Sequence, residues 1–114
     1  QVIKLAVMEN PWTISSKRIE VSYPKYDWEK LGKTENKDER VNEGPVFLCH
    51  DGKLCLIYSA SGCWSEYYCL GLLEFTGKDF SVDNVMKKSN WKKHNPLWPS
   101  LRNQSEPWIT DYKS

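Results

Sequence analysis

The sequence lacks the features that would place it in several large classes of protein. No apolar run approaches the roughly 20 residues that a membrane-spanning helix requires, so we predict no membrane association. The 16 basic and 15 acidic residues give a formal net charge of +1. There is therefore neither the basic excess typical of nucleic-acid binding nor the charge imbalance typical of disorder. With 39% hydrophobic residues, the chain is predicted to be globular, with no nucleic-acid partner.

The beginning of the chain also lacks an initiator methionine and the basic segment and cleavage site of a signal peptide. Residues 2–8 form only a short apolar patch. We interpret this beginning as internal, as in a fragment or a processed product.

The four cysteines, Cys49, Cys55, Cys63 and Cys69, do not have the closely paired spacing of a zinc site. We predict no metal and no cofactor. In an oxidising compartment three disulfide connectivities are open. Cys63–Cys69 is the most plausible pair, since it would close the intervening loop onto the next strand, whereas free buried thiols are an equally good interpretation of Cys49 and Cys55.

Aromatic residues are plentiful, with six Trp, six Tyr and three Phe. Their usual use is packing in a core, and their other common use is stacking on sugar rings. We expect Trp12, Trp28, Trp91 and Trp98 to pack between a sheet and its loops.

The secondary structure is predicted to be mainly strand. Apolar runs at 45–49 and 54–58 are joined through Asp51-Gly52, the strongest short-range hairpin signal. Further strands are predicted at 2–8, 19–23, 67–75 and 91–94, with a helical turn within 79–90. The charge-rich stretch 29–40 is interpreted as a solvated loop, and the lysine pairs 87–88 and 92–93 as a solvated face. Four consecutive antiparallel strands form the repeat unit of a β-propeller, which cannot bury both faces alone.

Several motifs occur in a specific order along this pattern. They are Met8-Glu9-Asn10-Pro11-Trp12-Thr13, Tyr26-Asp27-Trp28-Glu29, Val41-Asn42-Glu43-Gly44-Pro45, Tyr58-Ser59-Ala60-Ser61-Gly62-Cys63-Trp64, Tyr68-Cys69-Leu70-Gly71-Leu72-Leu73 and Trp91-Lys92-Lys93. The ordered set resembles the middle of family 43 glycoside hydrolases, the inverting arabinofuranosidases and xylosidases built on five-bladed propellers. The resemblance implies an all-β partial propeller over residues 1–98, with one four-stranded antiparallel blade at about 41–98 and part of a neighbour. Residues 99–114 are a divergent polar tail with a glycosylation triplet at Asn103.

The resemblance implies that Glu43 is the general acid that protonates the leaving oxygen. A surface glutamate in a turn is the alternative. Gly44 allows a positive φ or a close substrate approach, and Pro45 fixes the entry to the strand. Ser59, Ser61 and Trp64 lie after the second hairpin strand and are predicted to bind substrate, although Trp64 could equally pack beneath its loop.

The resemblance also implies a general base and an aspartate that tunes the acid, both in blades before residue 1. Asp27 and Asp38 lack the motif context, so no base is assigned. His50 and His94 are poor matches for the axial histidine of the family.

The predicted function is inverting hydrolysis of O-glycosyl bonds in arabinose- or xylose-containing plant cell-wall polysaccharide, such as arabinan, arabinoxylan or xylan. The family implies an extracellular, secreted protein. The alternative is a catalytically inactive, carbohydrate-binding or degenerate propeller fragment, and a protein-interaction unit has only generic support. Because the base is missing, we expect these residues alone not to hydrolyse aryl arabinofuranosides or xylosides.

Overall fold

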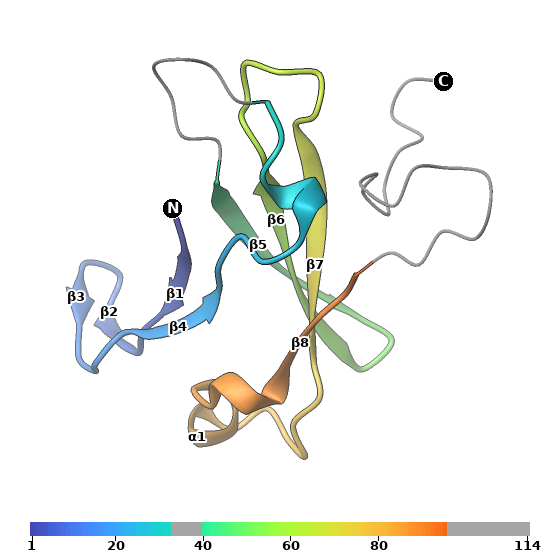
Figure 1. Cartoon of the computed structure of the whole chain (residues 1–114). Helices are drawn as coiled ribbons and strands as arrows, with labels where there is room; N and C mark the ends of the chain where they lie inside the picture. Colours follow the sequence, from blue (N-terminus) through green and yellow to red (C-terminus); the bar gives the residue numbers. More distant parts are fainter. Residues whose placement is uncertain (33–39, 96–114) are drawn as a thin grey trace.

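The computed structural model describes residues 1–32 and 40–95 of the chain (Figure 1). In chain order the elements are β1 (Ile3–Leu5), β2 (Met8–Asn10), β3 (Thr13–Ile14), β4 (Ile19–Ser22), the 3₁₀ turn η1 (Asp27–Glu29), β5 (Asn42–His50), β6 (Lys53–Ala60), β7 (Cys69–Phe75), α1 (Val82–Val85), η2 (Lys88–Asn90) and β8 (Trp91–Lys93). The prediction of an all-β chain is confirmed. No helix in the described ranges is long and apolar enough to cross a membrane.

Strands β5 to β8 form one antiparallel sheet in the order β5-β6-β7-β8, which confirms the predicted four-stranded blade. The β5–β6 hairpin turns at Asp51 and Gly52, whose φ angles are +48° and +71°. Two consecutive positive φ angles give the turn type whose twist matches the strands, and Asp-Gly accommodates them well. Both hairpin strands are longer than the apolar runs predicted, and β5 already begins at Asn42.

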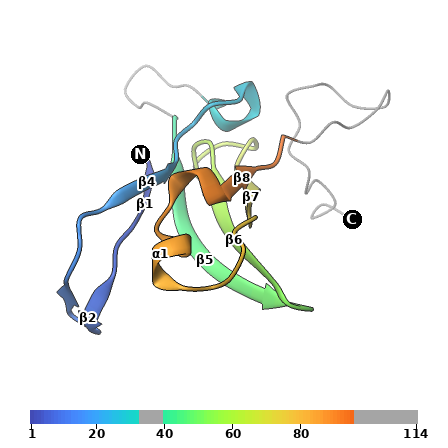
Figure 2. The ribbon, with the colours of Figure 1, turned by 90° about the horizontal axis from the view of Figure 1, so that it is seen from below.

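The N-terminal segment is the part that the strand prediction described incorrectly. Instead of one strand over 2–8, the chain forms β1, which pairs with β4, and then β2, which pairs with β3 in a separate two-stranded sheet. Strand β2 ends at Asn10, directly before Pro11. Figure 2 shows β1 and β4 lying beside β5, and backbone contacts between β1 and β5 agree.

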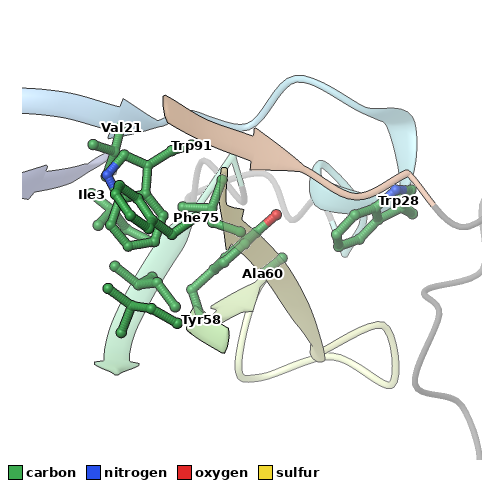
Figure 3. Close-up of a cluster of buried hydrophobic side chains, with 10 residues drawn as sticks. Ile3, Val21, Trp28, Tyr58, Ala60, Phe75 and Trp91 are labelled. Atoms are coloured by element: carbon green, nitrogen blue, oxygen red, sulfur yellow. The ribbon is translucent and has the colours of Figure 1, made fainter. Parts of the chain in front are cut away.

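The core lies between one face of the sheet and the N-terminal segment. Strand β6 alternates strictly, so that Leu54, Leu56, Tyr58 and Ala60 face this core. The core cluster is Ile3, Val21, Trp28, Leu54, Leu56, Tyr58, Ala60, Leu73, Phe75 and Trp91 (Figure 3). The predicted packing roles of Trp28 and Trp91 are therefore confirmed, whereas that of Trp12 is wrong because Trp12 is 82% exposed at the β2–β3 turn.

The other face of the sheet is also apolar but is not covered by the described residues. The register aligns Val46, Ile57 and Leu72 across three strands of this face, and the Val46 side chain is 64% exposed. Because one apolar face is buried and the opposite face is open, the sheet has the form of a propeller blade that lacks a neighbour on one side.

The helical turn predicted within 79–90 is confirmed by α1 and η2. Ser81 caps α1, since its Oγ accepts a hydrogen bond from the Asn84 N–H at 3.3 Å. Several predictions fall on residues outside the described ranges, namely most of the loop 29–40 with Asp38, Trp98, and the tail with its Asn103 triplet.

Candidate functional site around Glu43

Glu43 lies near the beginning of β5, directly before a β-bulge. Glu43 pairs with Ser59 and Val46 pairs with Ile57, so Gly44 and Pro45 together lie opposite one residue of β6. Gly44 has a φ of +57°, which matches the bulge type that places glycine in the left-handed region. Of the two roles predicted for Gly44, a positive φ or a close substrate approach, the positive φ is therefore confirmed. Because the bulge inserts one residue, Glu43 and Val46 lie on the same open face of the sheet.

The Glu43 side chain is half-buried and makes no hydrogen bond or ion pair with the residues that the structure describes. Its cross-strand partner Ser59 is also half-buried. A Cβ atom on Gly44 would lie 3.8 Å from the Ser59 Oγ, so this hydroxyl lies over the bulge. A carboxyl group and a hydroxyl group therefore occupy neighbouring positions on the open face, which is a suitable pair for a sugar and its glycosidic oxygen.

Ser61 is fully buried, and its hydroxyl has partners within the chain. It donates to the Trp28 carbonyl at 2.8 Å and accepts from the Leu31 N–H at 3.1 Å. Its φ of +64° is uncommon for a residue other than glycine. In the described chain Ser61 therefore joins η1 and the following Leu31 to the end of β6.

Trp64 has one packed surface and one exposed surface. Its ring lies against Gly62, where an added Cβ would be 2.6 Å from the ring, and its Nε1 donates to the Gly32 carbonyl at 3.2 Å. The side chain is still 41% exposed. Both predicted uses of Trp64 are compatible with this geometry, because one ring surface packs on the loop while part of the side chain stays accessible.

A buried polar cluster lies on the core side of the sheet, beneath the strand that carries Glu43. We use the name buried cluster for Ser22, Glu29, Asn42, Tyr58 and Lys93. Glu29 Oε1 accepts from Asn42 Nδ2 at 3.0 Å, from the Tyr58 hydroxyl at 2.8 Å and from Lys93 Nζ at 2.6 Å. Lys93 Nζ also donates to Asn42 Oδ1 at 3.0 Å, and Ser22 Oγ donates to the same oxygen at 2.6 Å.

The remaining polar atoms of the two charged groups are satisfied by backbone. Glu29 Oε2 accepts from the N–H groups of Lys25 and Tyr26 at 2.7 and 2.9 Å, and Lys93 Nζ donates to the Tyr23 carbonyl at 2.6 Å. The exposed fractions of the side chains are 0% for Glu29 and 11% for Lys93. A buried ion pair of this kind is tolerated only when its hydrogen bonds are complete, which is the case here.

Burial also shifts the ionisation of this cluster. It raises the pKa of the Tyr58 hydroxyl far above its ordinary value, and the neighbouring Glu29 carboxylate raises it further. Burial lowers the pKa of Lys93, while the hydrogen bond to Glu29 acts in the opposite direction. Tyr58 therefore remains a neutral hydrogen-bond donor.

The buried cluster corrects two sequence predictions. Glu29 is not part of a solvated loop, and Lys93 is not part of a solvated face. A signal for Lys93 was present, because the period-2 alternation of β8 places Lys93 on the same face as Trp91. For Glu29 the signal was weak, since Tyr26 occupies the N-cap position, where a serine or threonine would have marked a capping box.

The other candidates lie apart from this arrangement. Asp27 is exposed on η1, and His50 is exposed at the end of β5 beside Asp51. His94 Nε2 lies 2.8 Å from Glu74 Oε2. No group of three potential metal ligands occurs in the described parts of the chain.

All four cysteines are free thiols, so the expected Cys63–Cys69 disulfide is not formed. Cys49 and Cys55 do not share a face of the sheet, since Cys49 pairs with Leu54 and Cys55 pairs with Leu48.

Comparison with known proteins places this geometry in context. No family model matches the chain. An extracellular exo-α-(1→5)-L-arabinofuranosidase of Streptomyces chartreusis is 39% identical over 92 residues, which cover 78% of this chain and 24% of that protein. Alpha-L-arabinofuranosidase 43 of Humicola insolens is 34% identical over 97 residues, which cover 84% of this chain and 18% of that protein.

A solved structure gives the same result. The crystal structure of the α-L-arabinofuranosidase from Lactobacillus brevis superposes with a TM-score of 0.66 at 35% identity, covering 82% of this chain and 25% of that one. The chain thus spans about a quarter or less of the length of these relatives. The chain is homologous to a segment of the family 43 arabinofuranosidases, and the resemblance inferred from its motifs is confirmed.

Proposed function

We propose that this chain contributes the general acid of an inverting glycoside hydrolase that acts on arabinose-containing polysaccharide. The observation that supports the proposal best is the half-buried, unpartnered Glu43 carboxyl on the open face of the sheet, held between the buried Asn42 and the bulge at Gly44. The homology to arabinofuranosidases gives this carboxyl its chemical context.

In the proposed reaction, Glu43 donates its proton to the glycosidic oxygen as the bond to the anomeric carbon breaks. A water molecule, deprotonated by a carboxylate on the opposite side of the sugar, attacks that carbon in the same step. Inverting enzymes separate the two carboxyl groups by roughly 6.5–9.5 Å to leave room for the water. The base is assigned to no residue of this chain, and we place it in another blade of the complete propeller.

Substrate contacts are proposed for Ser59 and Trp64. The Ser59 hydroxyl neighbours Glu43 across the strand pair, and the accessible part of the Trp64 ring can stack on a sugar. Ser61 is proposed to hold the loop in place and not to contact the substrate, because its buried hydroxyl is hydrogen-bonded to Trp28 and Leu31. We propose arabinan and arabinoxylan as substrates, and xylan and β-xylosides as alternative substrates.

We also propose that the protein is secreted. Two of the relatives are named extracellular enzymes, and a plant cell-wall polysaccharide is met outside the cell.

A second candidate function is carbohydrate binding without catalysis. The accessible part of the Trp64 ring and the Ser59 hydroxyl favour it, because both can contact a sugar whether or not Glu43 donates a proton. It differs from the first candidate in its prediction for Glu43, because a binding module retains affinity for arabino-oligosaccharides when the acid is neutralised and releases no arabinose.

The test is hydrolysis of linear arabino-oligosaccharides by the full-length protein that contains these residues, with the Glu43→Gln variant beside it. Loss of the acid is expected to lower kcat by about 10²- to 10⁴-fold. Glu9→Gln makes the same chemical change at an exposed position of β2 and is expected to leave kcat unchanged. Proton NMR of the first product formed identifies inversion. Equal activity of the wild type and Glu43→Gln would exclude Glu43 as the acid.

A further inference from the structure

The buried cluster lies directly beneath the proposed acid, and Asn42 connects the two. Asn42 and Glu43 are consecutive residues of β5, so their side chains point to opposite faces of the sheet. The Asn42 side chain is 1% exposed on the core side, whereas Glu43 lies on the open face. Whatever fixes Asn42 therefore fixes the backbone from which Glu43 projects.

The Asn42 amide is held at both ends. Its Nδ2 donates to Glu29 Oε1 and to the carbonyl of Val41, and its Oδ1 accepts from Lys93 Nζ and Ser22 Oγ. Apart from the adjacent Val41, these partners come from η1, β8 and β4, so three elements that are distant in the sequence converge on one side chain. An amide with partners on all its polar atoms has one orientation and little freedom to move.

The strand continues from this fixed point into the bulge, where Gly44 is in the left-handed region. Glu43 is thus bounded on one side by a residue that is hydrogen-bonded to three elements and on the other by a fixed change of strand direction. General-acid catalysis requires the acid to be held at a fixed position, because a displacement of about 1 Å can lower the rate by about 100-fold.

We propose that Asn42, held by the buried Glu29–Lys93 ion pair and Ser22, is the positioning residue for the Glu43 carboxyl. This inference rests on the proposed function of Glu43. The cluster does not touch the substrate, so its effect on the reaction passes only through the position of the acid.

The test uses the dependence of kcat on the leaving group. A sugar leaving group needs the proton of the acid, whereas a dinitrophenolate departs without one. A displaced acid therefore slows hydrolysis of an arabino-oligosaccharide and barely changes hydrolysis of a dinitrophenyl arabinofuranoside. A variant that only lowers the folded fraction slows both reactions by the same factor.

The variants are Asn42→Ala and the milder Ser22→Ala, compared with Glu43→Gln in the full-length protein. We expect Asn42→Ala to lower kcat for the oligosaccharide by about 10- to 100-fold, to leave kcat for the dinitrophenyl substrate within about twofold, and to change KM little. Ser22→Ala removes one donor to Asn42 Oδ1 and leaves Lys93 in place, so the same selectivity is expected with a smaller loss. This variant keeps the test decisive if Asn42→Ala does not fold. Ser81→Ala removes a serine hydroxyl that caps α1 and bonds to no residue of the buried cluster, and is expected to show no selectivity.

The outcomes separate this inference from the proposed function. Selective loss in Asn42→Ala or Ser22→Ala supports positioning. Equal loss on both substrates, or no loss, while Glu43→Gln is selective, overturns the positioning role and leaves the acid in place. If Glu43→Gln is itself unselective, or the wild type hydrolyses neither substrate, the proposed function is wrong and the positioning role is overturned with it.

Discussion

Replacing Lys93 with methionine removes the positive charge of the buried cluster while keeping a side chain of similar length. The ammonium group lies 2.6 Å from Glu29 Oε1, 2.6 Å from the Tyr23 carbonyl and 3.0 Å from Asn42 Oδ1. After the replacement, the Glu29 carboxylate keeps four of its five hydrogen bonds but has no positive charge beside it. Because Glu29 is fully buried, water cannot take the place of the lost ammonium group.

The expected loss in the free energy of unfolding is about 3–5 kcal/mol, the range observed when one partner of a buried ion pair is removed. Burial lowers the pKa of Lys93, which shows that the buried ammonium group is itself costly. Removing it recovers part of that cost, so we expect the lower half of the range. Tyr58→Phe gives a graded comparison, because it deletes one hydrogen bond to the carboxylate and should cost about 1.5–3 kcal/mol.

The assay is urea unfolding followed by tryptophan fluorescence, with the variants compared at a common slope. Lys92→Met is the matched control. Lys92 is the preceding residue of β8 and is exposed, so its replacement should change stability by no more than about 0.5 kcal/mol. Equal effects of Lys92→Met and Lys93→Met would refute the buried ion pair and restore the interpretation of both lysines as a solvated face.

Three further predictions concern the sheet and its thiols. Gly71→Ala should destabilise the chain by about 1–3 kcal/mol, the typical cost of overpacking a core, because its Cβ would lie 2.2 Å from Tyr58 Cζ. A urea midpoint near that of the wild type would contradict this packing. Gly52→Ala has open space around its Cβ and a φ of +71°, so the same measurement should show only the backbone strain of about 1–2 kcal/mol. Burial raises the pKa of the Cys69 thiol to about 12 from 9.0, which lowers its thiolate fraction at pH 8 by roughly 1,000-fold. Mass spectrometry after iodoacetamide treatment should therefore find exposed Cys63 alkylated and Cys69 unmodified, and early labelling of Cys69 would contradict its burial.

The same thiol contributes to the pH dependence of stability. The pKa of Cys69 is about 12 in the folded chain and 9.0 in the unfolded chain. Between these values the unfolded chain loses the thiol proton while the folded chain keeps it. The contribution of Cys69 to the free energy of unfolding is therefore complete below pH 9 and is lost as the pH rises from about 9 to 12.

The local features of the fold were predictable because they depend on neighbouring residues. Asp51-Gly52 between two apolar runs specifies the hairpin, and the alternation of β6 identifies its buried face. The motif around Glu43 indicated a glycine with positive φ, and Gly44 has it. The split of the N-terminal strand was not predictable in this way, because the partners of β1 and β2 are chosen by tertiary packing.

The buried cluster was harder to predict because its members are far apart in the sequence. Glu29 and Lys93 are separated by 64 residues, and each lies beside other charged residues that are exposed. From composition and local pattern such residues are predicted to be exposed at the surface, which is correct for most charged side chains. Only the convergence of η1, β5, β6 and β8 in three dimensions shows that these two are paired.

This contrast bears on why the chain holds two charges inside its core. An ion pair buried this deeply adds little net stability compared with apolar residues of the same volume, because desolvation offsets most of the attraction. The presence of the ion pair is better explained by its orienting a neighbouring side chain. The hydrogen bonds of the Glu29 carboxylate and the Lys93 ammonium group fix the Asn42 amide in one orientation, which an apolar contact would not do. Since Asn42 precedes Glu43, the unusual core and the proposed acid belong to one arrangement, in which the polar core determines where the carboxyl of Glu43 lies.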